Sequence, residues 1–115
     1  TAFIATEEAR ASEEYKQAIV DGSSDDIVYS NLFTGVHGNY LAPSIVAAGM
    51  DPANLPEGDL KTMNFGGGEG SKAKAWKDIW GSGQGIGAVT EVASAAAFVE
   101  KLKREYFAAR RRLAL

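Results

Sequence analysis

The clearest pattern along the chain lies near its end, where apolar residues recur at alternating spacings of three and four. They are Val99, Leu102, Tyr106, Ala109 and Leu113. This spacing places the five side chains on one face and predicts an amphipathic helix with a narrow apolar stripe. We expect another surface to cover that stripe.

A helix and a strand are predicted in the first thirty residues. Ser12 is placed to cap a helix that runs through Val20, with acidic residues at its positive end and Gly22 just after its stop. The run Ile-Val-Tyr-Ser at residues 27–30 is short and β-prone. It is the one convincing strand that the pattern gives.

The other stretches are less regular. Residues 39–48 predict a helix, with Pro43 in its first turn and a glycine at its end. Residues 50–70 have no periodicity and are rich in loop signals. Residues 71–80 look helical, and residues 1–5 resemble the end of a buried strand.

A dense glycine run stands out from these elements. From Trp80 to Gly87 the sequence is W-G-S-G-Q-G-I-G. Because glycine costs a helix about 0.5–1 kcal/mol relative to alanine, such a run indicates unusual φ/ψ angles or a close backbone approach. A glycine loop that opens onto a helix presents free N–H groups and a positive dipole end. We therefore expect a phosphate or an anionic ring system to bind here.

Composition and charge narrow the function. With 115 residues the chain is one domain at most, or a piece of one. A net charge of -3 gives no general attraction to nucleic acid or membranes, and we expect neither as a partner. The absence of cysteine excludes disulfides, thiolate metal sites and a cysteine nucleophile, and with a single histidine no metal site is expected. The absence of cysteine also fits a reducing compartment, and we expect a cytoplasmic protein.

The predicted elements do not make a complete fold by themselves. They amount to about four helices, one strand and much glycine-rich loop. The strands that would supply a sheet beneath the helices are missing. We therefore predict a mostly α fragment of an α/β protein whose central sheet lies upstream of Thr1.

Four segments together resemble the nitronate monooxygenase family, formerly called 2-nitropropane dioxygenases. Residues 1–9 look like its G-T-R-F-x-A-T-x-E-A segment, which related flavin-dependent enoyl-acyl-carrier-protein reductases share. Residues 14–18 (E-Y-K-Q-A) are similar to the helix that follows it. Residues 33–35 with 39–41 resemble an F-(S/T)-G turn and the next helix, and residues 80–87 resemble a (W/S)-x-A-G-Q-x-x-G signature. The matches keep their order and run almost from end to end.

The resemblance implies a particular architecture. The chain would be the C-terminal part and helical lid of an incomplete TIM (β/α)8 barrel that holds FMN. Residues 1–24 would form the end of the barrel with its following helix. Residues 25–93 would form a helical lid subdomain with the long glycine-rich loop. Residues 94–115 would form a C-terminal helix that packs on the barrel.

The resemblance also implies an activity and a site. The whole protein would oxidise alkyl nitronates with O₂, or alternatively reduce enoyl thioesters, and its catalytic histidine would lie upstream of this chain. Thr1 would bind the FMN phosphate. The residues lining the flavin or substrate side would be Ser82, Gly83, Gln84 and Gly85. One departure is that Ala2 stands where the family motif has arginine.

Several alternatives remain from the residues themselves. The glycine run could link two helices, or its Gly83-x-Gly85-x-x-Ala88 spacing could imitate a dinucleotide fingerprint. His37 could contact the substrate or flavin edge, or simply lie in a surface loop. The last helix could dock on a partner, which would make the chain a small helical interaction module. The protein could also form a homo-oligomer.

Overall fold

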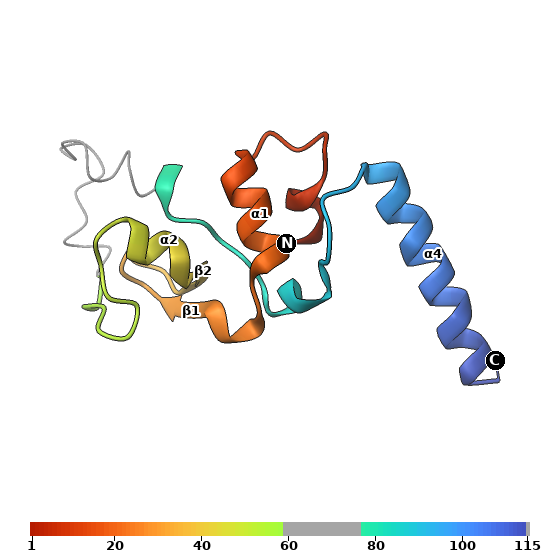
Figure 1. The fold of residues 1–115 in the computed structure, drawn as a ribbon. Coiled ribbons are helices and arrows are strands. Elements are labelled where there is room, and N and C mark those ends of the chain that lie inside the picture. The colour runs from red at the N-terminus through yellow and green to blue at the C-terminus, as the bar shows by residue number, and fades with distance from the viewer. Residues whose placement is uncertain (59–76, 115) are drawn as a thin grey trace.

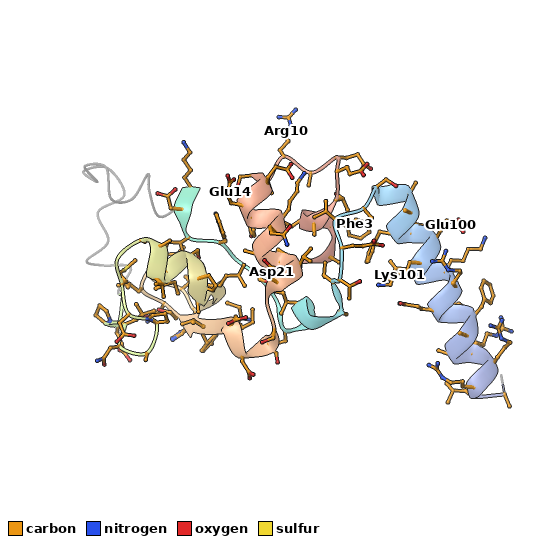
Figure 2. All side chains as sticks on the ribbon, in the orientation of Figure 1. Phe3, Arg10, Glu14, Asp21, Glu100 and Lys101 are labelled. Carbon is orange, nitrogen blue, oxygen red and sulfur yellow. The ribbon has the colours of Figure 1, made fainter. Side chains whose placement is uncertain are left out.

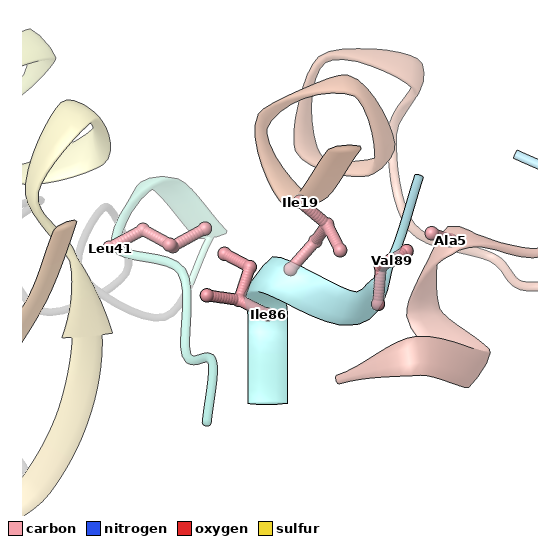
Figure 3. Packing of buried hydrophobic residues seen from close by; sticks show 5 residues of the cluster. All are labelled: Ala5, Ile19, Leu41, Ile86 and Val89. Carbon is pink, nitrogen blue, oxygen red and sulfur yellow. The ribbon is translucent and has the colours of Figure 1, made fainter. Parts of the chain in front are cut away.

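Side chains from distant parts of the chain meet in one small buried core. The computed structural model describes residues 1–58 and 77–114. The core residues come from both described parts of the chain, and none is more than 7% exposed (Figure 3). They are Ala5, Ile19, Leu41, Ile86 and Val89. The core therefore joins the first described part of the chain to the second.

The first residues form a turn, and the prediction of a strand end there is wrong. The 3₁₀ helix η1 spans Ala2–Ala5, and the Thr6 hydroxyl closes it by donating to the Phe3 carbonyl at 2.8 Å. A strand needs a neighbour along its length. In the described chain this segment pairs at one point only, where the Glu7 N–H donates to the Ala93 carbonyl at 3.0 Å and Thr6 bridges to Ala93.

The helix predicted after Ser12 is confirmed. Helix α1 spans Glu13–Asp21, and the Ser12 hydroxyl accepts the Tyr15 N–H at 3.2 Å as an N-cap. Gly22 follows the last turn with a φ of -78°, which any residue adopts. What requires glycine there is space, because a Cβ would lie 2.7 Å from the Ile86 Cδ1 atom and 2.9 Å from the Ala18 carbonyl oxygen.

A β-hairpin follows α1 and the short 3₁₀ helix η2 (Ser24–Asp26). Strand β1 spans Ile27–Ser30 as predicted, and it pairs antiparallel with β2, Gly38–Leu41. The prediction of a helix from Asn39 is therefore wrong at its start: helix α2 spans only Ala42–Ala47. Pairing with β1 and complete burial of the Leu41 side chain favour the extended backbone over an early helical turn.

The start of the glycine run, Trp80–Ser82, lies against the edge of β2 that does not pair with β1. Leu41 N–H donates to the Trp80 carbonyl at 2.8 Å, and Ser82 N–H donates to the Asn39 carbonyl at 3.2 Å. Gly81 forms an antiparallel bridge with Tyr40 between these two bonds. The three residues Trp80–Ser82 therefore extend the two-stranded sheet, and the second edge of β2 is covered.

The last helix, α4, spans Ala95–Arg112 and confirms the predicted periodicity. It leaves the body of the molecule and extends away from it (Figure 1). None of its residues is buried, and the stripe residues Val99, Leu102, Tyr106 and Leu113 are 50%, 43%, 62% and 69% exposed. Within the described residues, the stripe has no covering surface.

Contacts at one end attach α4 to the body. The Ala95 N–H donates to both carboxylate oxygens of Glu8, at 2.8 and 3.1 Å. Phe3 lies at the same junction (Figure 2) and meets Phe98 edge to face, with ring centroids 4.9 Å apart. A carboxylate at a helix N-terminus is favoured by the free N–H groups and the dipole. The anion site at the start of α4 is thus filled by the protein's own side chain.

The described residues make a mixed fold of three α-helices and one two-stranded antiparallel sheet. They include no parallel sheet, so the incomplete barrel remains a prediction. The helix predicted at 71–80 falls mostly outside the described residues, as does most of the 50–70 loop, although Lys77 and Asp78 are helical. No helix in the described part of the chain is both long enough and apolar enough to cross a membrane.

Gly22 provides a test of the core. We expect Gly22→Ala to lower the free energy of unfolding by about 1–3 kcal/mol, because the added methyl group forces Ile86 and the end of α1 apart. Gly87→Ala is the matched control, since a Cβ there meets nothing within 4 Å and its φ is not positive. Urea denaturation of both variants measures the difference. Equal stability of the two would contradict this role for Gly22.

Candidate functional site

The structure brings Thr1 to the glycine run. The Gly83 N–H donates to the Thr1 Oγ1 atom at 2.7 Å, across 82 positions of sequence. These are two of the five residues predicted to bind the cofactor, and they come from different segments of the family resemblance. Their contact forms the centre of the candidate site. Ser82, Gln84 and Gly85 are its other predicted members and adjoin Gly83 in sequence.

The backbone of the run does not explain its glycines. Gly83 has φ -98° and ψ 171°, and in the described residues the only glycines with positive φ are Gly35 and Gly49. The expectation of unusual φ/ψ angles is therefore wrong. A Cβ at Gly85 would meet nothing within 4 Å, whereas one at Gly83 would lie 3.1 Å from Thr1 Oγ1. The described residues therefore give no steric reason for glycine at Gly85.

The run does not open onto the long helix, contrary to the prediction. Residues Gln84–Ala88 form a 3₁₀ helix of their own, η3, and α4 begins seven residues after it ends. Ile86 anchors η3 by complete burial in the core, because its side chain fills the space beside Ile19 and Gly22 (Figure 3). The neighbouring Gln84 and Gly85 are exposed. The contacts of Gly83 and Ile86 therefore hold the run on both sides of the exposed residues Gln84 and Gly85.

Ser82 contributes an unpaired polar atom to the site. Its side chain is 9% exposed, and its Oγ atom finds no hydrogen-bond partner in the described chain. An unsatisfied buried hydroxyl costs about 1–3 kcal/mol. Because the oxygen is buried as well as unpaired, a ligand could bond to it only after the atoms that cover it moved.

Sequence reasoning missed two aromatic residues that support the site. The Tyr15 ring stacks on the Trp80 ring, with centroids 5.0 Å apart and planes 6° apart, and the Tyr15 hydroxyl donates to the Gly81 carbonyl. Burial raises the pKa of the Tyr15 phenol above its usual value of 10.0, so the phenol stays protonated, and a donor, to a higher pH than an exposed tyrosine does. The signal was present, since Tyr15 lies in the E-Y-K-Q-A segment that resembles an x-x-Y-K-x-A helix of the flavoprotein family. Its partner 66 positions away could not be read from spacing.

His37 lies apart from this group in the described contacts. It is exposed in the connection between β1 and β2, and its ring stacks on Tyr29 with centroids 4.5 Å apart. No hydrogen bond or ring contact of the described residues joins it to Thr1 or Gly83. Its role in substrate binding therefore remains a prediction.

A pocket of about 180 Å³ lies between η1, the segment before α4 and the first turns of α4. Its lining includes Ala5, Phe98 and Arg104, and none of the five predicted cofactor residues. Of the glycine run, Gln84, Gly85 and Gly87 are exposed at the surface, whereas Ser82 and Ile86 are buried. Groups of three or more histidine, aspartate or glutamate side chains placed to hold a metal do not occur in residues 1–58 and 77–114.

Comparison of the chain with protein-family models, with curated proteins and with solved structures found no match.

The raised pKa of Tyr15 predicts how stability depends on pH. The folded chain holds the phenolic proton more tightly than the unfolded chain, so this stabilisation is complete below the unfolded pKa of about 10 and is lost as the pH rises through the folded pKa. Tyr15→Phe should be less stable than the wild type at neutral pH, and the two should converge above about pH 10. Urea midpoints from pH 8 to 11 test this, with Tyr106→Phe as an exposed control. Parallel curves for wild type and Tyr15→Phe would refute it.

Proposed function

We propose that this chain is the C-terminal segment of an FMN-dependent oxidoreductase that oxidises alkyl nitronates with O₂. The observation that carries the proposal is the hydrogen bond between Thr1 Oγ1 and the Gly83 N–H. The family resemblance assigns both residues to one flavin site, and in the folded chain the two are in contact. A linker interpretation of the run gives no reason for such a contact.

The residues present fit the cofactor in two further respects. The open space in front of Gly85 lets a planar ring or a phosphate approach the backbone closely. The Ser82 hydroxyl is buried and unpaired, and it would gain a hydrogen bond if a polar edge of the ligand displaced the atoms that cover it. FMN would supply the redox chemistry, and this segment would hold and orient it.

The parts of the site that the described residues lack would come from the barrel that we propose precedes Thr1. These include the walls that face the exposed stretch at Gln84 and the catalytic histidine. The same segment is compatible with an FMN-dependent enoyl-thioester reductase, because the residues that choose the substrate would lie mostly upstream. Steady-state assays with a nitronate and with an enoyl thioester separate these two activities.

Flavin binding tests the proposal with two matched glycines. We expect Gly85→Ala to raise the Kd for FMN about tenfold or more in the whole protein, because a methyl group would occupy the space the cofactor needs. Gly87→Ala should leave the Kd unchanged, although its Cβ is equally free of internal contacts. Titration followed by flavin absorbance or fluorescence measures both. Wild-type affinity in Gly85→Ala would reduce the run to a linker.

One observation favours a second function, that of a small helical interaction module. The stripe on α4 is exposed, and Lys103 and Arg110 lie on the same helix. If α4 docks on another protein molecule, including a second copy of this chain, Leu102→Asp should abolish the complex and leave the fold intact. Size-exclusion chromatography with light scattering checks this. A monomeric wild type would contradict self-association through α4, and a whole protein that does not bind FMN would contradict the proposed flavin site.

A further inference from the structure

The surroundings of Gly81 give Tyr15 a role beyond packing. Its hydroxyl reaches from the first turn of α1 to the carbonyl of Gly81, the first glycine of the run. Its ring lies flat against Trp80, the residue before that glycine. One side chain therefore makes a directional bond and a broad contact to two successive residues at the point where the run begins.

The position of Tyr15 is itself fixed. Its N–H donates to the Ser12 hydroxyl that caps α1, and the next residue, Lys16, is almost completely buried with its Nζ atom donating to the Glu7 carbonyl at 3.3 Å. A ring on a capped first turn with a buried neighbour has little freedom. It can therefore hold the backbone of Gly81 in place, which a side chain on a loose loop could not do.

The opposite side of the run is held by the sheet. Trp80 and Ser82 bond to β2 through their backbones, and Trp80 N–H also donates to the Ser44 hydroxyl at 3.1 Å. Tyr15 and β2 thus hold the first residues of the run, Trp80–Ser82, from two different elements. The hydrogen bond to Thr1 and the burial of Ile86 hold the residues that follow. The exposed Gln84 and Gly85 lie between these fixed points.

We infer that Tyr15 is a positioning residue for the flavin site, which acts through the Gly81 carbonyl and the Trp80 ring to hold Gln84 and Gly85 ready for the ligand. A glycine-rich segment loses much conformational freedom when it is ordered, and a ligand that must order it binds more weakly. Tyr15 removes part of that cost before the ligand arrives. This inference rests on the proposed function.

The experiment compares Tyr15→Phe with Tyr106→Phe in the whole protein, using FMN as the probe. Tyr15→Phe keeps the stacked ring and removes only the bond to Gly81. We expect its Kd for FMN to rise about three- to tenfold, as for the loss of one hydrogen bond. The visible circular dichroism of bound FMN should also change, which a loss of stability alone would not cause at saturating FMN. Tyr106→Phe, on the exposed face of α4, should match the wild type in both.

Three outcomes separate the two proposals. If the wild type binds FMN and Tyr15→Phe has the same Kd and the same dichroism, the positioning role is wrong and the proposed function stands. If the wild type does not bind FMN, the proposed function fails, and this inference fails with it. If Tyr15→Phe does not fold, Trp80→Phe and Trp80→Ala probe the same contact: the first, which keeps a stacked ring, should bind within about twofold of the wild type, and the second should bind more weakly. Equal affinity of these two would overturn the inference.

Discussion

The burial of Ile86 is the contact on which the rest of the described structure depends. Its side chain enters the space beside Ile19 on α1, and Leu41 from the hairpin closes the same cluster. Complete burial of such a side chain is worth about 1.5–3 kcal/mol, a large share of a small protein's stability. It also draws the glycine run onto α1. The buried side chain of Ile86 therefore stabilises the core and also holds the candidate site in place.

The burial of Ile86 is one of several contacts that hold the glycine run. Trp80–Ser82 is held by backbone pairing, Gly83 by Thr1 and η3 by Ile86. Gln84 and Gly85, the first residues of η3, are exposed between these contacts. Support around an exposed backbone stretch is what a binding loop needs, because a rigid surrounding lets a few groups meet a ligand without further ordering.

Local signals in the sequence were sufficient for some elements. Ser12 identifies the start of α1 because a cap bonds three residues ahead, and the stripe of α4 is a property of one helix. Local signals failed where a residue distant in the sequence decides the structure. Asn39 looks like a helix cap, but pairing with β1 places it in a strand. Residues 1–5 look like a strand, but they form a 3₁₀ turn because no neighbouring strand runs along their length.

The candidate site likewise combines features that local sequence indicates with features that depend on distant partners. The glycine run and Thr1 were singled out from sequence, the first by composition and both by resemblance, and their hydrogen bond is a feature of the folded chain. The support from Tyr15 and Trp80 could not be predicted, since a stack across 65 positions leaves no periodic trace. Nor could the use of Glu8 at the start of α4, because the carboxylate reaches across 87 positions.

The attachment of α4 has a mechanical consequence. The helix has 18 residues and is about 27 Å long, and its contacts to the body lie in its first turn, at Ala95 and Phe98. A rod hinged at one end magnifies rotation, so a tilt of about 10° at Glu8 would carry the other end through about 5 Å. Because the apolar stripe lies beyond that attachment, the angle set at Glu8 and Phe98 decides which region of space the stripe reaches.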